Sequence, residues 1–365
     1  MGCSSERWTA CSTYGNVCSV KKNIFGIQYL RAYAALLVVF NHLWSTGGVI
    51  SKYLGFDIIG GFGVDIFFVI SGFIMAYTIS DYSKPERFGI GWSFIKKRIH
   101  RIYPLHVLVL VPMILVYILG CILKKDEVSI YSIIGSVFLL PDFTASSSYR
   151  MINPVEWTLV YEMIFYISLS AFIFITPGKK SCLIIYSIFL ALVVLIINGF
   201  GFRGERLEWV NIKYIVGDTI FLDFIMGFFV YYLSKKIKIK LTAIQTMSLI
   251  LVLTALAVIM AKAGLPRLVS YGCPAFILVL IFTVEEKLNR EKINLLMTLG
   301  GASYAIYLTH PLYLKAYSAI HHLKPSVGEG SDLINFFISL AAIITGLLTY
   351  KYIEPWLNKI TRPKI

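Results

Sequence analysis

Two ionisable residues lie inside an apolar stretch near the N-terminus, and their spacing suggests chemistry within a membrane. The stretch 24–45 is long enough to cross a bilayer, which takes about 20 mostly apolar residues, yet it contains Arg31 and His42. On an α-helix this spacing is about three turns, so both side chains leave one face, about 16 Å apart along the axis. Such groups usually face a bundle interior or a watery cavity, which predicts a polar path along this helix. The alternative is an arginine that reaches lipid headgroups and a histidine that bonds a backbone carbonyl.

Two carboxylates are expected at the outer side of the same membrane and are candidates for acid–base catalysis. Asp65 lies in the glycine-rich segment 60–73, near the outer end of the second apolar stretch, where it is expected to orient the His42 imidazole. A helix-capping role for Asp65 is the alternative. Glu162 lies in a later apolar stretch, about 8 to 10 Å inside the outer boundary at about 1.5 Å per residue. A carboxylate at that depth needs a partner, which makes Glu162 a second candidate to assist His42.

A dense cationic segment precedes the third apolar stretch and is expected at the cytoplasmic side. Arg98 and Arg101 are three residues apart and therefore share a helix face. Such a pair suits bidentate binding of phosphates, and Lys97 and Tyr103 are assigned to the same site. Positive charge that only sets the membrane topology is the alternative for the lysines.

Two further residues are candidates for substrate binding. Trp157 is expected at the membrane interface, where tryptophan is also common as an anchor. His310 is expected midway along its apolar stretch, where a structural hydrogen bond is the alternative. The cysteines show no zinc spacing, so no metal site is predicted.

Composition places the chain among polytopic helical membrane proteins. Of its 365 residues 57% are hydrophobic and only 15% are charged, and the mean hydropathy is +0.74. The net charge of +14 lies mainly in short loops, so it indicates topology rather than a nucleic-acid partner. We predict ten transmembrane helices, at 24–45, 62–80, 102–123, 157–176, 182–200, 214–233, 243–262, 266–285, 298–318 and 332–353, with a short re-entrant or interfacial helix at 129–141.

Charge counting supports an arrangement with both termini in the cytoplasm. The loops expected inside carry 22 lysines and arginines, against 11 in those expected outside. We predict a leader or disordered cytoplasmic tail at 1–22, one membrane domain at 23–356 and a cytoplasmic tail at 357–365.

Five motifs in this order resemble those of the acyltransferase family 3 membrane proteins, over nearly the whole chain after residue 22. Arg31 and His42 match the family's arginine, ten residues, histidine signature, and Gly63 to Phe73 match its glycine-rich block. The three remaining blocks fall on Arg98 to Pro104, on Trp157 to Glu162 with threonine in place of the usual serine, and on Ser303 to His310. The chain ends at Ile365 without the hydrolase-like domain of many relatives, so it resembles the stand-alone group of bacterial O-antigen and exopolysaccharide O-acetyltransferases.

The resemblance implies acetyl-CoA as donor and a hydroxyl of a surface or lipid-linked glycan as acceptor, at the cytoplasmic (inner) membrane of a bacterium. In that hypothesis Arg98 and Arg101 hold the CoA phosphates, Arg31 positions the donor, and His42 acts as general base or carries the acetyl group. A proton-coupled glycan or lipid transporter is the alternative, since intramembrane histidines and carboxylates are expected there too. Inverted repeats typical of transporters are not visible in the sequence.

Overall fold

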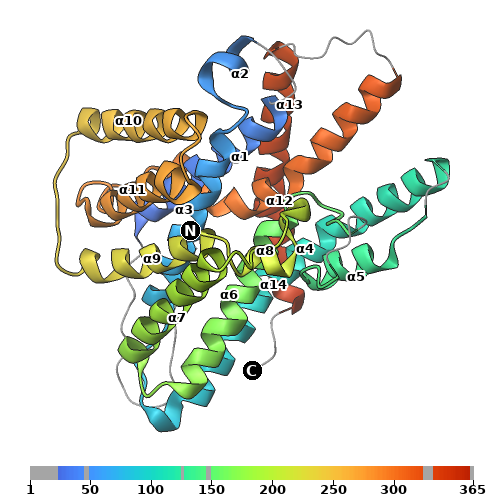
Figure 1. Cartoon of the computed structure of the whole chain (residues 1–365). Helices are drawn as coiled ribbons and strands as arrows, with labels where there is room; N and C mark the ends of the chain where they lie inside the picture. The colour runs from blue at the N-terminus through green and yellow to red at the C-terminus, as the bar shows by residue number, and fades with distance from the viewer. Residues whose placement is uncertain (1–23, 45–48, 125–126, 145–148, 324–331, 362–365) are drawn as a thin grey trace.

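The computed structural model describes residues 24–44, 49–124, 127–144, 149–323 and 332–361, and these ranges form helices without a β-sheet (Figure 1). The predicted all-α class is therefore confirmed for this part of the chain. The predicted tail at 1–22 lies outside the described residues. Of the predicted tail at 357–365, residues 357–361 belong to a helix and the rest lies outside the described residues.

Ten longer helices account for most of the fold, and each overlaps one predicted span. They are α1 (Phe25–Trp44), α3 (Ile59–Thr78), α4 (Arg87–Lys124), α6 (Glu156–Ile175), α7 (Lys179–Gly199), α9 (Ile220–Ser234), α10 (Ala243–Lys262), α11 (Cys273–Val284), α12 (Asn294–Leu323) and α13 (Asp332–Leu348). Short helices lie between or after them: α2 (Val49–Leu54), η1 (Lys84–Glu86), α5 (Ile130–Phe138), η2 (Leu207–Trp209), α8 (Ile212–Ile215), η3 (Leu268–Gly272), η4 (Thr349–Ile353) and α14 (Glu354–Thr361).

Six helical segments of the described chain are long and apolar enough to cross a membrane. They are Ile59–Thr78, Lys84–Leu123, Glu156–Ile175, Lys179–Gly199, Ala243–Lys262 and Asp332–Thr361, and two shorter apolar helices cover Ile220–Ser234 and Leu268–Val284. A helical membrane protein is thereby supported, whereas the number of ten spans and the cytoplasmic position of both termini stay predictions.

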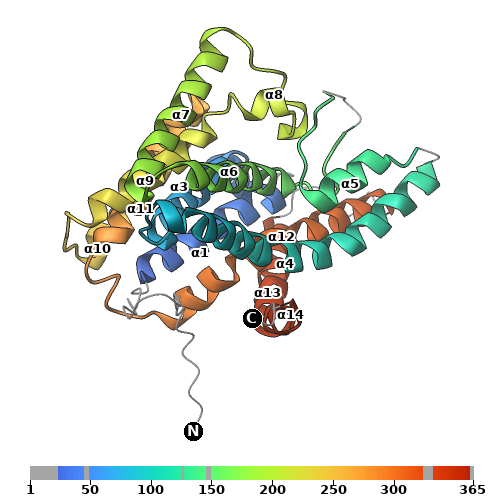
Figure 2. The ribbon, with the colours of Figure 1, turned by 90° about the horizontal axis from the view of Figure 1, so that it is seen from below.

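α1 lies at the centre of the bundle, packed between α3 and α12 and also touching α11 and α13 (Figure 2). Two glycines allow this packing. A Cβ added at Gly300 of α12 would lie 2.0 Å from the Gln28 carbonyl oxygen, and one at Gly63 would lie 2.7 Å from that of Ala34. The expected close approach of the glycine-rich segment to a neighbouring helix is therefore observed.

α4 is much longer than the predicted span 102–123, because it begins at Arg87 and continues for 38 residues. Lysine and arginine are good helix formers, so the cationic segment is the first part of this helix rather than a loop. At about 1.5 Å per residue α4 extends about 57 Å, well beyond a hydrocarbon layer of about 30 Å.

α5 returns along α4 as a short helix of nine residues, which fits the predicted re-entrant segment. The Ser129 amide donates to the Tyr117 hydroxyl at 3.1 Å, whereas the Tyr103 hydroxyl donates to the Phe138 carbonyl at 2.9 Å. The start of α5 thus lies near Tyr117 of α4 and its end near Tyr103, so the two helices run antiparallel. The chain then begins α6 beside the middle of α4. α6 then runs antiparallel to α4, with Ser170 Oγ donating to the Gly91 carbonyl at 3.0 Å.

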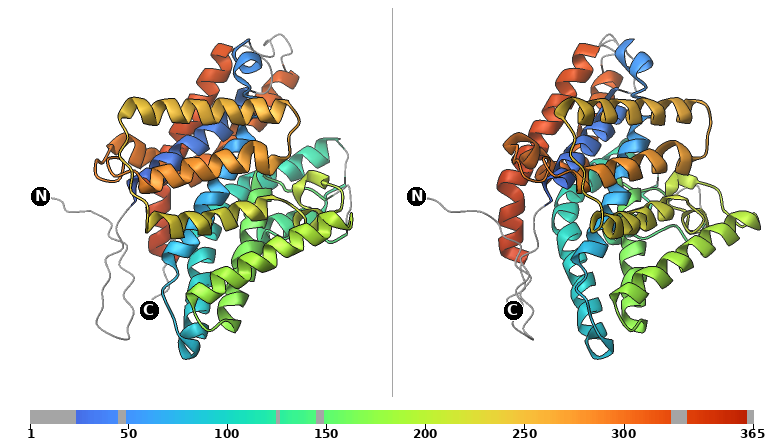
Figure 3. Two further views of the ribbon diagram at one scale, coloured as in Figure 1. Left: turned by 60° about the vertical axis from the view of Figure 1, so that its left-hand side comes forward. Right: turned by 90° about the vertical axis from the view of Figure 1, so that its left-hand side faces the viewer.

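α9, α10 and α11 form the other side of the bundle, where α10 and α11 lie next to each other and α11 also contacts α9 (Figure 3). α3 and α9 pack closely because Gly72 faces the backbone of Phe224, with only 2.1 Å between an added Cβ and that carbonyl oxygen. This contact places the C-terminal half of α3 beside the N-terminal half of α9.

Candidate active site

The C-terminal half of α1 presents His42 to a second histidine, His310 of α12. Their rings are stacked with centroids 5.0 Å apart, and His310 Nε2 lies 3.0 Å from His42 Nδ1. His310 is fully buried, whereas His42 is half-buried. We call these two residues the histidine pair.

The contacts of His310 determine which nitrogen of a neutral His42 ring carries the hydrogen. His310 Nδ1 lies 3.2 Å from the Ile306 carbonyl oxygen, which can only accept a hydrogen bond. In a neutral ring Nδ1 therefore carries the hydrogen and Nε2 accepts. His42 Nδ1 must then donate to His310, which leaves His42 Nε2 with an unshared electron pair. This is the tautomer that a general base or nucleophile requires.

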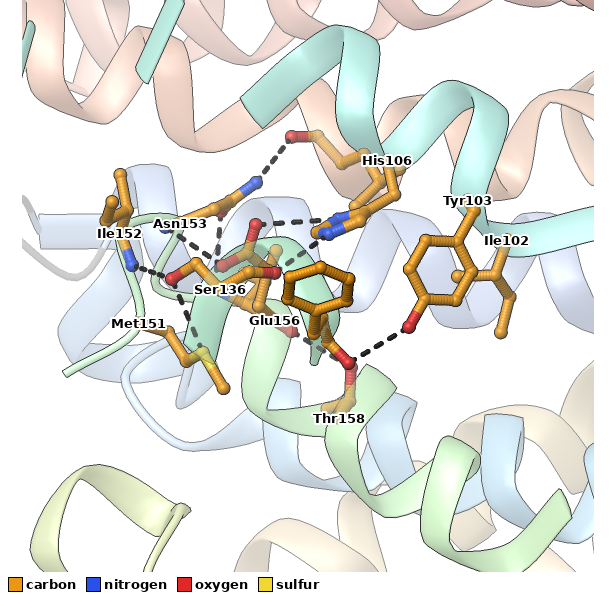
Figure 4. Close-up of polar contacts among 12 residues, drawn as sticks. Ile102, Tyr103, His106, Ser136, Met151, Ile152, Asn153, Glu156 and Thr158 are labelled. Carbon is orange, nitrogen blue, oxygen red and sulfur yellow. Dashed lines mark hydrogen bonds and ion pairs between the residues drawn. The ribbon is translucent and has the colours of Figure 1, made fainter. Parts of the chain in front are cut away.

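A buried polar cluster next to the histidine pair holds the re-entrant segment in place (Figure 4). His106 Nδ1 of α4 lies 3.5 Å from Glu156 Oε1 of α6, and His106 Nε2 lies 3.0 Å from the Ser136 carbonyl of α5. The Asn153 side chain donates to the Leu308 carbonyl of α12 at 3.2 Å. The cluster therefore joins α4, α5, α6 and α12 close to His310.

The N-terminal half of α1 presents Arg31 to ionisable groups from three other helices. Arg31 interacts electrostatically with Arg101 of α4, Glu162 of α6 and Glu354 of α14. Arg98 lies one turn before Arg101, and its guanidinium is over the rings of Phe94 and Tyr166, at 5.4 and 5.9 Å. We call Arg31, Arg98, Arg101, Glu162 and Glu354 the arginine cluster.

Arg98 and Arg101 differ in their surroundings although they share a helix. Arg98 is buried and donates through Nη2 to Thr78 Oγ1 at 2.8 Å, while its Nε has no hydrogen-bond partner in the described chain. Arg101 and Lys97 are exposed. One arginine is therefore held by α3, and the other cations are free to meet a ligand.

Glu162 belongs to the arginine cluster and not, as predicted, to the surroundings of His42. Its carboxylate accepts hydrogen bonds from Ser71 Oγ at 2.9 Å and from the Tyr166 hydroxyl at 2.7 Å. The physical reason is the re-entrant segment, because α6 starts beside the middle of α4 and Glu162 is a further 9 Å or so along it.

Asp65 does not orient His42, so that predicted contact is wrong for the described residues. Its carboxylate forms a bidentate pair with Arg267, in which Nε lies 3.0 Å and Nη2 2.5 Å from Oδ2. Asp65 is buried, and a buried carboxylate requires such a cationic partner.

The remaining predicted residues have well-defined contacts. The Tyr103 hydroxyl donates to the Phe138 carbonyl of α5, and its assignment to the CoA site stays a prediction. Trp157 stacks on Trp209, with ring centroids 4.9 Å apart. His310, predicted to bind substrate, instead contacts His42 directly. Within the part of the chain that the structure describes, no three His, Cys, Asp or Glu side chains are grouped to hold a metal ion.

The sequence analysis missed His106, Glu156 and Arg267 as site residues. His106 lies within the cationic motif and Glu156 directly precedes Trp157, so both stood beside residues that were selected. Arg267 begins a predicted span, and an intramembrane arginine is itself a signal that an acidic partner is near.

Fold and site together define an integral-membrane protein with a histidine pair and an arginine cluster at two positions along one helix, α1. A family model described as an acyltransferase domain matches residues 24–355. The chain therefore belongs to the acyltransferase 3 family and is an acyltransferase, which decides against the transporter alternative.

Three similar proteins illustrate the family. The exopolysaccharide production protein ExoZ of Rhizobium meliloti is 28% identical over 302 residues, which cover 81% of this chain and 89% of ExoZ. The O-acetyl transferase of Shigella phage Sf6 is 28% identical over 183 residues, 47% of this chain and 52% of that protein. The O-acetyltransferase OatA of Staphylococcus aureus is 23% identical over 367 residues, 92% of this chain but only 57% of OatA. No solved structure matches this chain significantly.

Proposed function

We propose that this protein transfers an acetyl group from cytoplasmic acetyl-CoA to a hydroxyl of a surface or lipid-linked glycan, at the cytoplasmic membrane of a bacterium. The observation that carries the proposal is the arrangement along α1. His42 donates through Nδ1 to His310, and Arg31 lies in the arginine cluster about 16 Å further along the same helix. The glycan acceptor is supported by the names of similar proteins, an exopolysaccharide production protein and O-acetyltransferases.

The arginine cluster suits the phosphates of acetyl-CoA. Arg98 and Arg101 offer fork-shaped donors, and exposed Lys97 adds charge beside them. Arg31 would then attract the donor toward the interior of the bundle. The acetyl group is carried at the far end of CoA from its nucleotide phosphates, so an extended molecule bridges the separation between the two sites.

Two reaction sequences fit the geometry of His42. In direct transfer, His42 Nε2 removes the proton of the sugar hydroxyl while the hydroxyl oxygen attacks the thioester carbonyl. The carbon–sulfur bond breaks, and the CoA thiolate takes up a proton. In the acetyl-enzyme sequence, Nε2 first attacks the thioester, the carbon–sulfur bond breaks and the CoA thiolate leaves and takes up a proton. The sugar hydroxyl then attacks the acetyl-imidazole, the bond between the acetyl carbon and Nε2 breaks, and the hydroxyl proton passes to the released imidazole. In both, His310 is a positioning residue that holds the His42 tautomer.

Mass spectrometry of surface glycans tests the proposed function. Glycan from cells that produce the protein should carry an additional acetyl group on its repeat unit, which is lost when the gene is deleted and restored by the wild-type chain. Identical glycan masses with and without the protein would contradict the proposal.

A further inference from the structure

We propose that Trp157, Trp209, Arg206 and Arg267 form a binding subsite for a sugar ring of the acceptor glycan, next to the ring that is acetylated. The four residues are called the tryptophan subsite. That the bound glycan is an acceptor rests on the proposed function, whereas the binding of a sugar chain is tested separately.

The tryptophan subsite is built from stacked planar groups. Trp157 and Trp209 are stacked at 4.9 Å with an interplanar angle of 21°, and the edge of Trp157 meets Tyr161 at 5.6 Å. The guanidinium carbon of Arg206 lies 4.5 Å from the Trp209 ring centroid, and that of Arg267 lies 5.3 Å from it. Both tryptophans are half-buried, so part of each ring faces outward.

The backbone that holds Trp209 is strained. Leu207, Glu208 and Trp209 have φ values of 26°, 53° and 66°, a left-handed conformation that non-glycine residues adopt at a cost. Three such residues in succession persist only where the surroundings hold them, and backbone strain of this kind clusters at ligand-binding sites.

The loop that contains Trp209 is fastened to the re-entrant segment on its other side. The Asp142 amide donates to the Val210 carbonyl at 2.8 Å, and the Ile212 amide donates to the Asp142 carbonyl at 2.9 Å. The Asn211 side chain also donates to the Glu205 carbonyl at 2.9 Å. Trp209 is therefore fixed before any ligand binds, which lowers the entropy lost on binding.

The two arginines present hydrogen-bond donors in different ways. Arg267 is held by its bidentate pair with Asp65, which sets the plane of its guanidinium. Arg206 is exposed and has no carboxylate within ion-pair distance among the described residues. Its fork of N–H groups is thus available for a hydroxyl pair or a carboxylate of a sugar.

A contact chain connects the tryptophan subsite with the histidine pair. Thr158, the neighbour of Trp157, shares a hydrogen bond of 2.8 Å with the Tyr307 hydroxyl. The Tyr307 ring lies 5.9 Å from that of His310, which contacts His42. The tryptophan subsite and the histidine pair are therefore connected through packed residues of α6 and α12.

The tryptophans are not explained as a lipid anchor. An interfacial anchor presents its ring at headgroup level. Trp209 instead stacks on an interior helix, and the exposed side chains around it are Glu205, Arg206 and Glu208. These polar side chains can form hydrogen bonds with a sugar, and they lie in the same loop as the exposed rings of Phe200 and Phe202.

Calorimetric titration tests the inference without acetyl-CoA. The probe is the surface glycan of the producing cells, stripped of O-acetyl groups with mild base and added to the full-length protein in nanodiscs. Trp209→Ala should weaken binding about 10- to 100-fold, and Arg206→Ala about 5-fold or more, because aromatic and arginine side chains dominate such contacts. Trp209→Phe should retain most of the affinity. Phe202→Ala, which removes an exposed aromatic ring of the same loop, is the matched control and should stay within about twofold.

The outcomes separate the inference from the proposed function. Absence of glycan binding by the wild type, or unchanged affinity in both Trp209→Ala and Arg206→Ala, would overturn the subsite. A glycan that binds through Trp209 but is never acetylated would contradict the proposed function and leave the subsite standing. Since Arg206 is exposed, its substitution keeps the test valid if Trp209→Ala fails to fold.

Discussion

The two halves of α1 differ in the kind of polar group that surrounds them. Arg31 meets arginine and glutamate side chains contributed by α4, α6 and α14, whereas His42 contacts the His310 imidazole of α12. The arginine cluster contains three arginines and two glutamates, which leaves one excess positive charge. The histidine pair carries no charge when both rings are neutral.

This difference indicates that the arginine cluster binds the donor and that the histidine pair transfers a proton. A net positive cluster attracts an anionic donor, and charge-assisted hydrogen bonds to phosphate are among the strongest in proteins. A neutral histidine with a fixed tautomer has an unprotonated nitrogen ready to accept a proton. Substitutions in each half should therefore change different kinetic constants.

Replacement of His42 should have the largest effect on the reaction. His42→Ala removes the proposed general base, so kcat for acetyl transfer should fall by about 10²- to 10⁴-fold. Radiolabelled acetyl transfer to glycan measures the effect. His100→Ala, which changes a half-buried histidine of α4 outside both sites, is the control. Near-normal transfer by His42→Ala would remove His42 from the mechanism.

Replacement of Asp65 should mainly affect stability. Asp65→Asn leaves the Arg267 guanidinium without its carboxylate, and loss of one partner of a buried pair costs about 3 kcal/mol. Thermal unfolding should therefore occur at a lower temperature, and the double variant Asp65→Asn/Arg267→Gln should recover part of the loss. A variant with wild-type stability and a kcat reduced as in His42→Ala would instead restore Asp65 as a partner of His42.

Replacement of His310 should reduce kcat without changing either KM. His310→Ala removes the acceptor for His42 Nδ1, and loss of such an orienting partner typically costs about 10- to 100-fold. His310→Gln keeps an acceptor oxygen and should recover part of the activity. If His310→Ala raised the acceptor KM and left kcat unchanged, His310 would be a substrate-binding residue as predicted from the sequence.

Replacement of Arg101 should have a smaller effect, and it should change the acetyl-CoA KM rather than kcat. Arg101→Ala should raise the acetyl-CoA KM about 10-fold and leave the acceptor KM within about twofold, because a charged hydrogen bond contributes about 1.5 kcal/mol or more. Arg101→Lys should reverse only part of this rise in the acetyl-CoA KM. Lys96, which lies over the Trp92 ring at 5.3 Å, provides the control Lys96→Ala. An unchanged acetyl-CoA KM in Arg101→Ala would contradict its role.

The sequence predicted features that depend on one helix at a time. The common face of Arg31 and His42 follows from helical periodicity, and the close glycine contacts follow from composition. The partners of buried groups did not follow, because His42 and Asp65 meet residues 268 and 202 positions away. The position of Glu162 was predicted wrongly because α6 follows the re-entrant segment and begins beside the middle of α4. Helical periodicity does not indicate where a helix begins relative to its neighbours.

Acetyl transfer across sealed inverted membrane vesicles tests most directly whether a donor at one face of the membrane acetylates an acceptor at the other. Radiolabelled acetyl-CoA is added outside, at the exposed cytoplasmic face, and de-O-acetylated glycan is trapped in the lumen. We predict label on the trapped glycan with the wild-type protein and none with His42→Ala. Labelling that occurs only after the vesicles are permeabilised, so that donor and acceptor share one side, would contradict the proposed transfer along α1.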